Sequence, residues 1–231
     1  IKDNSELKKL KIKIVINSIN SYNEDNNFIK TYNSNVTIPS KIFSCIKNLN
    51  INYFINIDTI LDRRTNFYAL SKYIFRNFIK NTNLSSKLKV IDLRYHNFYS
   101  NDVTDRSIIS IISKYSIENK EFLMTKGSQK RDFIHINDAT NLVLQILKNI
   151  KKFKDKNYFE FKVGGGQIIS INEIAKLIRK FYKSNEKLNL KEKKYKNIYE
   201  EIKYSSYNKE LKRYINWKPK YNIKKIFAAK N

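Results

Sequence analysis

Residues 53–80 read YFINIDTILDRRTNFYALSKYIFRNFIK, and this stretch decides the expected fold of the chain. Residues 53–57 form a short apolar run rich in β-prone side chains, which predicts a buried strand ending near Thr59. Residues 62–66 are polar, and apolar side chains recur at helical spacing after them. The stretch therefore predicts a strand, a loop and an amphipathic helix in that order.

Tyr68 and Lys72 lie four residues apart and share one face of the predicted helix. A free phenol titrates near pH ~10, whereas a nearby ammonium favours the phenolate. We therefore expect Lys72 to lower the pKa of Tyr68, so that Tyr68 exchanges protons at neutral pH. Thr59, at the end of the strand, can offer a hydroxyl to the same substrate oxygen. These three residues form a candidate catalytic site that needs neither a metal ion nor a thiol.

The Tyr-x-x-x-Lys spacing carries little information by itself, since the chain also has it at Tyr158, Tyr199, Tyr214 and Tyr221. Tyr68 differs from these copies because a strand ending at a hydroxyl residue precedes its helix. This context resembles the extended short-chain dehydrogenase/reductase family, the NAD-dependent epimerases, dehydratases and reductases of nucleotide sugars. The resemblance extends from about residue 12 to residue 227.

Three further segments are similar to family motifs and follow in the family's order. Residues 56–59, NIDT, resemble the Asn-Thr-Asp-Thr of a branch that contains CDP-abequose synthase-like proteins. Residues 93–99, LRYHNFY, are similar to Leu-Arg-x-x-Asn-x-Tyr-Gly, and residues 126–135, KGSQKRDFIH, to Gly-x-x-x-Arg-Asp-Phe-Ile-His. By this resemblance Asn97 and Arg131 bind the diphosphate of a nucleotide sugar, which suits the two-pronged Arg side chain. A surface ion pair with Asp132 or Asp138 is the alternative role of Arg131.

The resemblance also implies a role for each residue of the candidate catalytic site. Tyr68 would exchange a proton with a sugar hydroxyl while NAD or NADP takes or gives the hydride. Lys72 would hold the nicotinamide ribose, and Thr59 would hydrogen-bond the reacting oxygen. The family's dimer interface uses the same helix, so we expect a homodimer in which part of this helix faces the partner, namely Tyr73, Phe75 and Phe78.

Alternation of strands and helices along the chain predicts an α/β fold. We expect a Rossmann-like doubly wound parallel sheet, truncated at its N-terminus, with a smaller α+β substrate domain toward the C-terminus. The expected NAD(P)-binding core is residues 1–97, completed by 131–164, and the expected substrate domain is residues 98–130 and 165–231. The strands of the expected core include residues 12–19, and a helix is expected after Asn35.

The chain departs from the family at its start, where the family has a Gly-rich turn that binds the dinucleotide pyrophosphate. The first glycine here is Gly127, and the run 164–166 leads into a capping box at Ser170 and Glu173 rather than a phosphate-binding sequence. About 60 residues, two units of ~30, would restore the usual start. We therefore expect a fragment or a truncated protein, and a catalytically inactive sugar-nucleotide-binding relative is the alternative function.

Composition narrows the remaining classes of function. The net charge is +25, but the basic residues are spread along the whole chain, so a nucleic-acid-binding module is only a third alternative. The charge would also attract an anionic substrate. One cysteine, Cys45, cannot form an internal disulfide, and His96 and His135 are too few for a zinc site without further ligands. No apolar run reaches the ~20 residues of a membrane span, and we expect a cytoplasmic protein.

Overall fold

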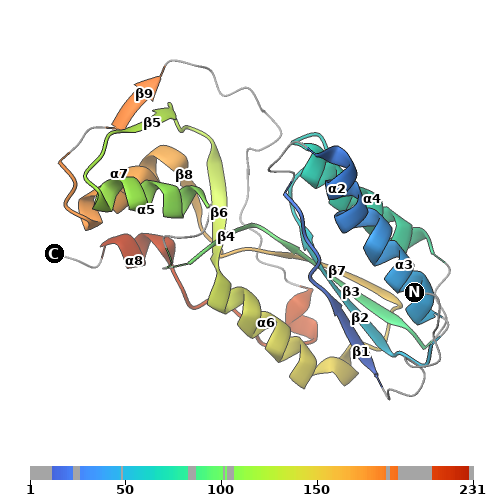
Figure 1. Ribbon diagram of the computed structural model, residues 1–231. Coiled ribbons are helices and arrows are strands. Elements are labelled where there is room, and N and C mark those ends of the chain that lie inside the picture. Colours follow the sequence, from blue (N-terminus) through green and yellow to red (C-terminus); the bar gives the residue numbers. More distant parts are fainter. Residues whose placement is uncertain are drawn as a thin grey trace. The chain divides into compact units, whose positions relative to one another are not determined.

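The computed structural model describes residues 12–22, 27–47, 49–82, 87–100, 102, 107–185, 188–191 and 210–228. The chain divides into two compact units (Figure 1). The first comprises Ile1–Arg94 and Asn149–Lys162, and the second comprises Tyr95–Lys148 and Val163–Asn231. Each unit is described by itself, and the domain boundaries expected from the sequence stay a prediction.

The first unit is built on a parallel sheet with the strand order β1-β2-β3-β7. Its strands are β1 (Ile14–Asn17), β2 (Tyr53–Thr59), β3 (Lys89–Tyr95) and β7 (Tyr158–Val163). Strands β1 and β2 pair in parallel, with Asn17 opposite Asn56. The predicted Rossmann-like α/β fold is confirmed, although β1 is shorter than the expected strand over 12–19.

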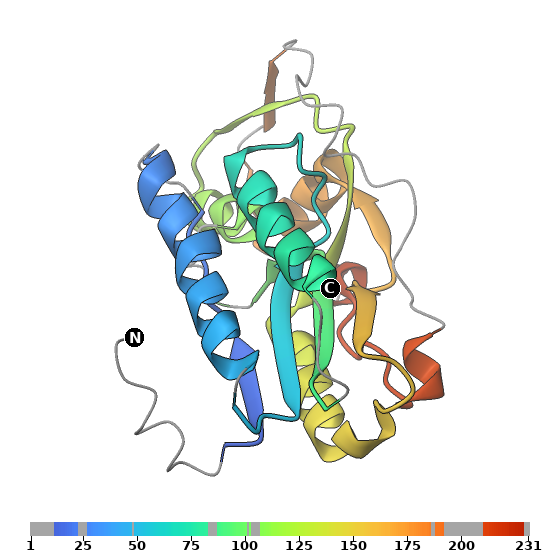
Figure 2. The same ribbon diagram turned by 90° about the vertical axis from the view of Figure 1, so that its right-hand side faces the viewer.

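Helices of the first unit lie side by side in Figure 2, where the N-terminal helical stretch runs next to α4. They are α2 (Phe28–Tyr32), a π-helical turn (Asn33–Thr37), α3 (Ile38–Lys47), α4 (Phe67–Asn81) and a 3₁₀ turn (Ile150–Lys152). The sequence predicts a helix only after Asn35, but Asn35 lies inside the helical stretch, within the π turn. Pro39 has no N–H to donate to the carbonyl of residue 35, and the wider turn falls at this place.

Aromatic packing joins α3 and α4 to one face of β2. The rings of Phe43 and Phe54 are 5.0 Å apart, and those of Phe54 and Phe75 are 6.5 Å apart. Phe75 is therefore a core residue, and the prediction that it partly faces another subunit is wrong. Phe78 is 38% exposed. The guanidinium carbon of Arg63 lies over the Tyr73 ring, 4.7 Å from the centre of that ring.

The second unit contains two small sheets and four α-helices among its described residues. Its strands and helices are β4 (Asn97–Tyr99), α5 (Ile108–Ile117), β5 (Phe122–Thr125), β6 (Lys130–His135), α6 (Ile136–Lys148), β8 (Ile168–Ser170), α7 (Ile171–Phe181), β9 (Leu188–Lys191), a 3₁₀ turn (Leu211–Arg213) and α8 (Ile223–Ala228). Strand β6 pairs with β4 in parallel and with β8 in antiparallel orientation. Strands β5 and β9 form the other sheet.

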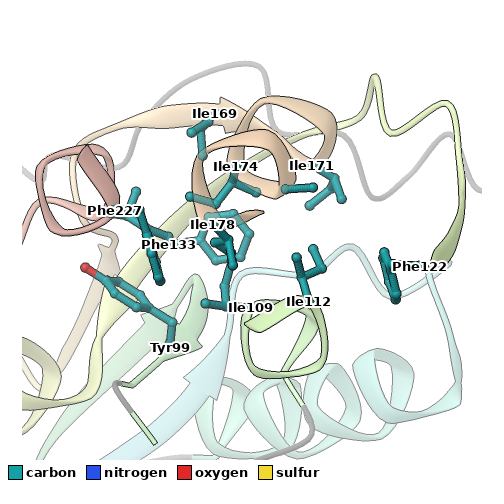
Figure 3. Packing of buried hydrophobic residues seen from close by; sticks show 12 residues of the cluster. Tyr99, Ile109, Ile112, Phe122, Phe133, Ile169, Ile171, Ile174, Ile178 and Phe227 are labelled. Carbon is teal, nitrogen blue, oxygen red and sulfur yellow. The ribbon is translucent and has the colours of Figure 1, made fainter. Parts of the chain in front are cut away.

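Apolar side chains of β4, β6, β8, α5 and α7 meet in a second core (Figure 3). Buried residues of this core include Tyr99, Ile109, Phe133, Ile169, Ile174 and Ile178. The core therefore holds together segments that are far apart in the sequence.

Helix α7 begins at the predicted capping box, because Ser170 Oγ accepts a hydrogen bond of 3.1 Å from the Glu173 N–H.

The glycine run before β8 packs against β6. A Cβ atom on Gly165 would lie 1.9 Å from the carbonyl oxygen of Phe133. The Gly165 N–H donates a hydrogen bond of 2.8 Å to Asp132 Oδ1. Close approach of two backbone segments therefore explains a glycine here.

Asn66 fixes the start of α4, two residues before Tyr68. Its side-chain oxygen accepts a hydrogen bond of 2.8 Å from the Ala69 N–H. We expect Asn66→Ala to lower the free energy of unfolding by about 1 kcal/mol, because the helix loses its N-cap. Chemical denaturation measures this change. Asn81→Ala, at the exposed far end of the same helix, should change stability by less than about 0.5 kcal/mol, and equal losses would contradict the capping role.

Candidate functional site

Tyr68 and Thr59 come together where β2 ends and α4 begins. Thr59 is the last residue of β2 and Tyr68 is the second residue of α4. Both Tyr68 and Thr59 are buried, and Thr59 and Tyr22 are polar neighbours that act on the pKa of the Tyr68 hydroxyl. The rings of Tyr22 and Tyr68 are 4.6 Å apart, so Tyr22 covers Tyr68. A phenol and an alcohol hydroxyl are thus within reach of one substrate oxygen.

Lys72 lies one helical turn after Tyr68, and its ammonium is held by the backbone. The Nζ atom donates to the carbonyl of Ile57 at 2.9 Å and to that of Ile19 at 3.4 Å. Burial lowers the pKa of Lys72, while Asp58 and Asp92 act in the opposite direction. The structure therefore brings Thr59, Tyr68 and Lys72 together within the first unit.

The prediction that Lys72 lowers the pKa of Tyr68 is wrong. Burial raises the pKa of Tyr68 well above its usual value, and the neighbouring Tyr22 and Asp58 raise it further. Thr59 acts in the other direction through its hydrogen bond. Tyr68 therefore holds its proton at neutral pH, which makes it a proton donor.

Asn35 belongs to the same site, although the sequence indicated only a helix start there. Its side-chain amide donates to Ser71 Oγ at 2.9 Å and to the Ser21 carbonyl at 2.8 Å. Its side-chain oxygen accepts a hydrogen bond of 2.8 Å from the Ser21 N–H. Ser71 Oγ in turn donates to the Tyr68 carbonyl at 2.7 Å. Asn35 thus fastens the segment after β1 to the helix that carries Tyr68.

A buried polar network lies under α4, and sequence reasoning also missed it. Asn17 Nδ2 donates to Asn56 Oδ1 at 2.8 Å, and Asn56 Nδ2 donates to Asp92 Oδ1 at 2.7 Å. The Tyr158 hydroxyl donates to Asp92 Oδ2 at 3.1 Å. Burial and the nearby charge of Asp58 raise the pKa of Asp92 to about 7.

The same network contains a buried ion pair. Arg76 Nη1 donates to Asp58 Oδ2, and both side chains are buried. A charge that is buried with its partner is stabilised by that partner, so the pair ties α4 to β2.

Asn97 and Arg131 both belong to the second unit, on the paired strands β4 and β6. Asn97 lies opposite Phe133, and Arg131 precedes Phe133 by two residues, so the three side chains share a face of the sheet. Arg131 is buried, and its Nη1 donates to the Lys130 carbonyl at 3.2 Å. Asp138 accepts hydrogen bonds from the backbone N–H groups of residues 220 and 221.

Polar atoms without a partner gather on the same face of β4 and β6. Within the described residues, Asn97 Nδ2, Tyr99 Oη and His135 Nε2 are buried and make no hydrogen bond. His135 Nδ1 accepts from the Asn137 N–H at 3.2 Å, so Nε2 carries the proton of the neutral ring. These unused donors can bind phosphate or hydroxyl oxygens of a ligand.

Across the described ranges, no group of three or more His, Cys, Asp or Glu side chains is arranged to hold a metal ion. None of the helices described has both the length and the apolar character needed to cross a bilayer.

Sequence comparison relates the chain to a known family. The sequence model of the NAD dependent epimerase/dehydratase family matches residues 2–164. A CDP-abequose synthase of Salmonella muenchen is 27% identical over 169 residues, which is 68% of this chain and 55% of that protein. The chain thus spans about half of the length of this curated relative.

Structure comparison gives the same architecture. The UDP-glucose 4-epimerase of Thermotoga maritima, solved with UDP-glucose, has a TM-score of 0.77 and 16% identity, covering 93% of this chain and 74% of that chain. A UDP-glucuronic acid 4-epimerase variant of Bacillus cereus, solved with NAD and a UDP-fluoro sugar, has a TM-score of 0.75 and 17% identity, covering 98% and 77%. At such identities the likeness shows the fold alone.

Proposed function

This chain belongs to the NAD dependent epimerase/dehydratase family, and on that premise we propose that it acts on a nucleotide sugar through NAD(P)-linked hydride transfer. Thr59, Tyr68 and Lys72 are the proposed catalytic residues. One observation carries the proposal: the buried Tyr68 lies beside the buried Thr59 and one helical turn before the buried ammonium of Lys72. Such a set can donate a proton to a sugar oxygen and bind neighbouring hydroxyls without a metal ion.

The donors around Lys72 fit the ribose of a nicotinamide cofactor. An ammonium has three N–H donors, and the carbonyls of Ile57 and Ile19 accept two of them. Within the described residues one donor is left for a ribose hydroxyl. The bound nicotinamide would supply or remove the hydride. We propose NAD rather than NADP as the cofactor, because the Bacillus cereus epimerase was solved with NAD.

Tyr68 and Thr59 would divide the work at the reacting oxygen. Nothing lowers the pKa of Tyr68 below that of an ordinary phenol, so Tyr68 is protonated at neutral pH and can give its proton to the oxygen of a keto group as negative charge develops there. Thr59 would hydrogen-bond the same oxygen and orient it. Asn35 would hold the Tyr68 helix through Ser71. Reduction of a keto sugar is therefore the direction that the protonation state favours, within the wider class of epimerases, dehydratases and reductases.

The experiment that tests the function is a search for turnover by the purified protein. CDP- and UDP-hexoses are mixed with NAD or NADP, their 4-keto derivatives are mixed with NADH or NADPH, and the absorbance of the reduced nicotinamide is followed. A keto derivative should be reduced, and the product should be a nucleotide sugar with a new hydroxyl. Nucleotide-sugar binding without any turnover would instead favour the inactive sugar-nucleotide-binding alternative.

The nucleotide end of the substrate is proposed to lie on the β4–β6 face of the second unit. Arg131 and Asn97 would contact the diphosphate, and the unused donors of Tyr99 and His135 would contact nearby oxygens. UDP-glucose in the Thermotoga maritima structure supports this substrate class. CDP is an equal candidate, because the chain resembles a CDP-abequose synthase.

We expect Arg131→Met to weaken binding of the nucleotide sugar about 10- to 100-fold, since a hydrogen bond to a charged group is worth about 1.5–3 kcal/mol. Isothermal titration with CDP, UDP and a nucleotide sugar measures the change. Arg213→Met is the control, because Arg213 is an exposed arginine of the same unit. Unchanged affinity in Arg131→Met would contradict the assignment.

Assembly, location and pathway complete the proposal. A homodimer through α4 is proposed, and the exposed Phe78 on this helix supports it. Sedimentation velocity measures the state of assembly.

A role in surface polysaccharide (O-antigen) sugar synthesis is proposed from the resemblance to CDP-abequose synthase. The cytoplasmic location expected from the sequence stays a prediction.

A further inference from the structure

The inner face of α4 rests on a polar strip of the sheet. Asn56 and Asp58 are two residues apart on β2, so their side chains point to the same face as Phe54. That face meets α4, because Phe54 packs against Phe75 and Asp58 pairs with Arg76. Polar and charged side chains therefore replace apolar packing along part of this interface.

Lys72 lies on the same strip. It precedes Arg76 by one helical turn, so both side chains leave α4 on the side of the sheet. Its Nζ atom binds the carbonyl of Ile57, which is the residue between Asn56 and Asp58. The ammonium is therefore fixed directly above the polar strip, although Tyr68 is the residue that the family resemblance pairs with it.

Asp92 completes the strip from the neighbouring strand β3. Its two carboxylate oxygens accept hydrogen bonds from Asn56 and from Tyr158. Asn56 is oriented by Asn17, which donates to its side-chain oxygen and leaves its N–H₂ group for Asp92. Both ends of this hydrogen-bonded chain thus donate toward one carboxylate, an arrangement that stabilises the ionised form.

Both acidic and basic side chains lie near Asp92. Asp58 acts on it from β2, and Lys72 and Arg76 interact with it from α4. On β7, Glu160 pairs with Arg94 of β3 at 2.7 Å. Lys80 reaches Glu160 from the exposed end of α4, at 3.8 Å. The buried ammonium of Lys72 has no carboxylate in direct contact among the described residues, so it depends on the charges of Asp58 and Asp92 nearby.

We propose that Asp92 is a positioning residue for the Tyr68–Lys72 site: its carboxylate, together with that of Asp58, forms an anionic floor that keeps Lys72 protonated beneath α4. The catalytic meaning of this inference rests on the proposed function, but the electrostatic link does not. Burial and the nearby charge of Asp58 raise the pKa of Asp92 to about 7, so the part of the floor's charge that Asp92 carries is present above neutral pH and is lost as the pH falls. The protonation of Asp92 would thereby set the electrostatic field at Lys72 within the physiological range.

The test is an NMR titration of the protein with ¹³C-labelled lysine, without cofactor or substrate. The ¹³Cε signal of Lys72 is assigned by its absence in Lys72→Arg. We expect Asp92→Asn to shift the Lys72 titration to lower pH, because one negative charge is removed while the shape of the side chain is kept. Tyr158→Phe removes a hydrogen bond to Asp92 but no charge, so the Lys72 titration should stay close to that of the wild type. An unchanged Lys72 titration in Asp92→Asn overturns the proposal.

A measurement on the wild type keeps the proposal testable if Asp92→Asn does not fold. The Lys72 signal should show a second, smaller step near pH 7, where Asp92 takes up its proton. A single step would overturn the coupling. Failure of the proposed function looks different: the Lys72 and Asp92 titrations would be coupled as described, while no nucleotide sugar would be turned over.

Discussion

Replacing Tyr68 by Phe is expected to lower turnover of the nucleotide sugar by a factor of about 10²–10⁴, which is the usual contribution of a positioned proton donor. Only the hydroxyl is removed, beside the polar groups of Thr59 and Tyr22. The ring still packs against Tyr22, 4.6 Å away, so the variant should fold. The measurement is the rate of NADH or NADPH oxidation at saturating substrate, with the unfolding curve recorded beside it.

Tyr73→Phe is the matched control. Tyr73 lies on the same helix, but its hydroxyl accepts from Arg63 at 2.7 Å on the exposed side of α4. Its loss should leave turnover within a factor of about two, as expected for a surface change of less than about 0.5 kcal/mol. Wild-type turnover in Tyr68→Phe would exclude Tyr68 as the proton donor, whatever the control does.

Arg76→Met should be the most destabilising substitution of a charged residue in the first unit. It leaves the buried Asp58 carboxylate without its partner, and breaking a buried pair in this way lowers the free energy of unfolding by about 3–5 kcal/mol. Urea denaturation at neutral pH measures the loss.

The pair of Arg64 and Asp62 supplies the comparison for this prediction. Its charged atoms are 2.8 Å apart, but the two side chains are 58% and 36% exposed. We expect Arg64→Met to change the free energy of unfolding by only about 0–1 kcal/mol, as is usual for exposed pairs. Similar losses in Arg64→Met and Arg76→Met would show that burial of the Asp58–Arg76 pair contributes nothing beyond an ordinary surface contact.

Local patterns were sufficient to predict the elements that carry the catalytic residues. The structure has β2 over Tyr53–Thr59 and α4 over Phe67–Asn81, close to the strand and helix predicted from residues 53–80. Both follow from hydrophobic periodicity within one short window, which the sequence displays directly.

Asn35 and Asp92 could not be predicted in the same way, because their partners are remote in sequence. Asn35 bonds Ser71, 36 residues away, and Asp92 bonds Tyr158, 66 residues away. No window of local sequence contains both members of such a pair. Helical spacing has a related limit: it predicts that Tyr68 and Lys72 share a face, but not that the ammonium reaches a backbone carbonyl. The upward shift of the Tyr68 pKa comes mainly from burial, which helical spacing does not predict either.

The cover over Tyr68 has a kinetic consequence. Tyr22 is 55% exposed, whereas the backbone of the preceding Ser21 is fastened at both its N–H and its carbonyl by Asn35. Uncovering the Tyr68 hydroxyl therefore needs a rotation of one exposed side chain, a picosecond-to-nanosecond event, rather than a loop displacement. Enzymes typically turn over about 1–10³ times per second. Arrival of the substrate at Tyr68 would thus equilibrate long before the proton moves, and the cover would set no part of the rate.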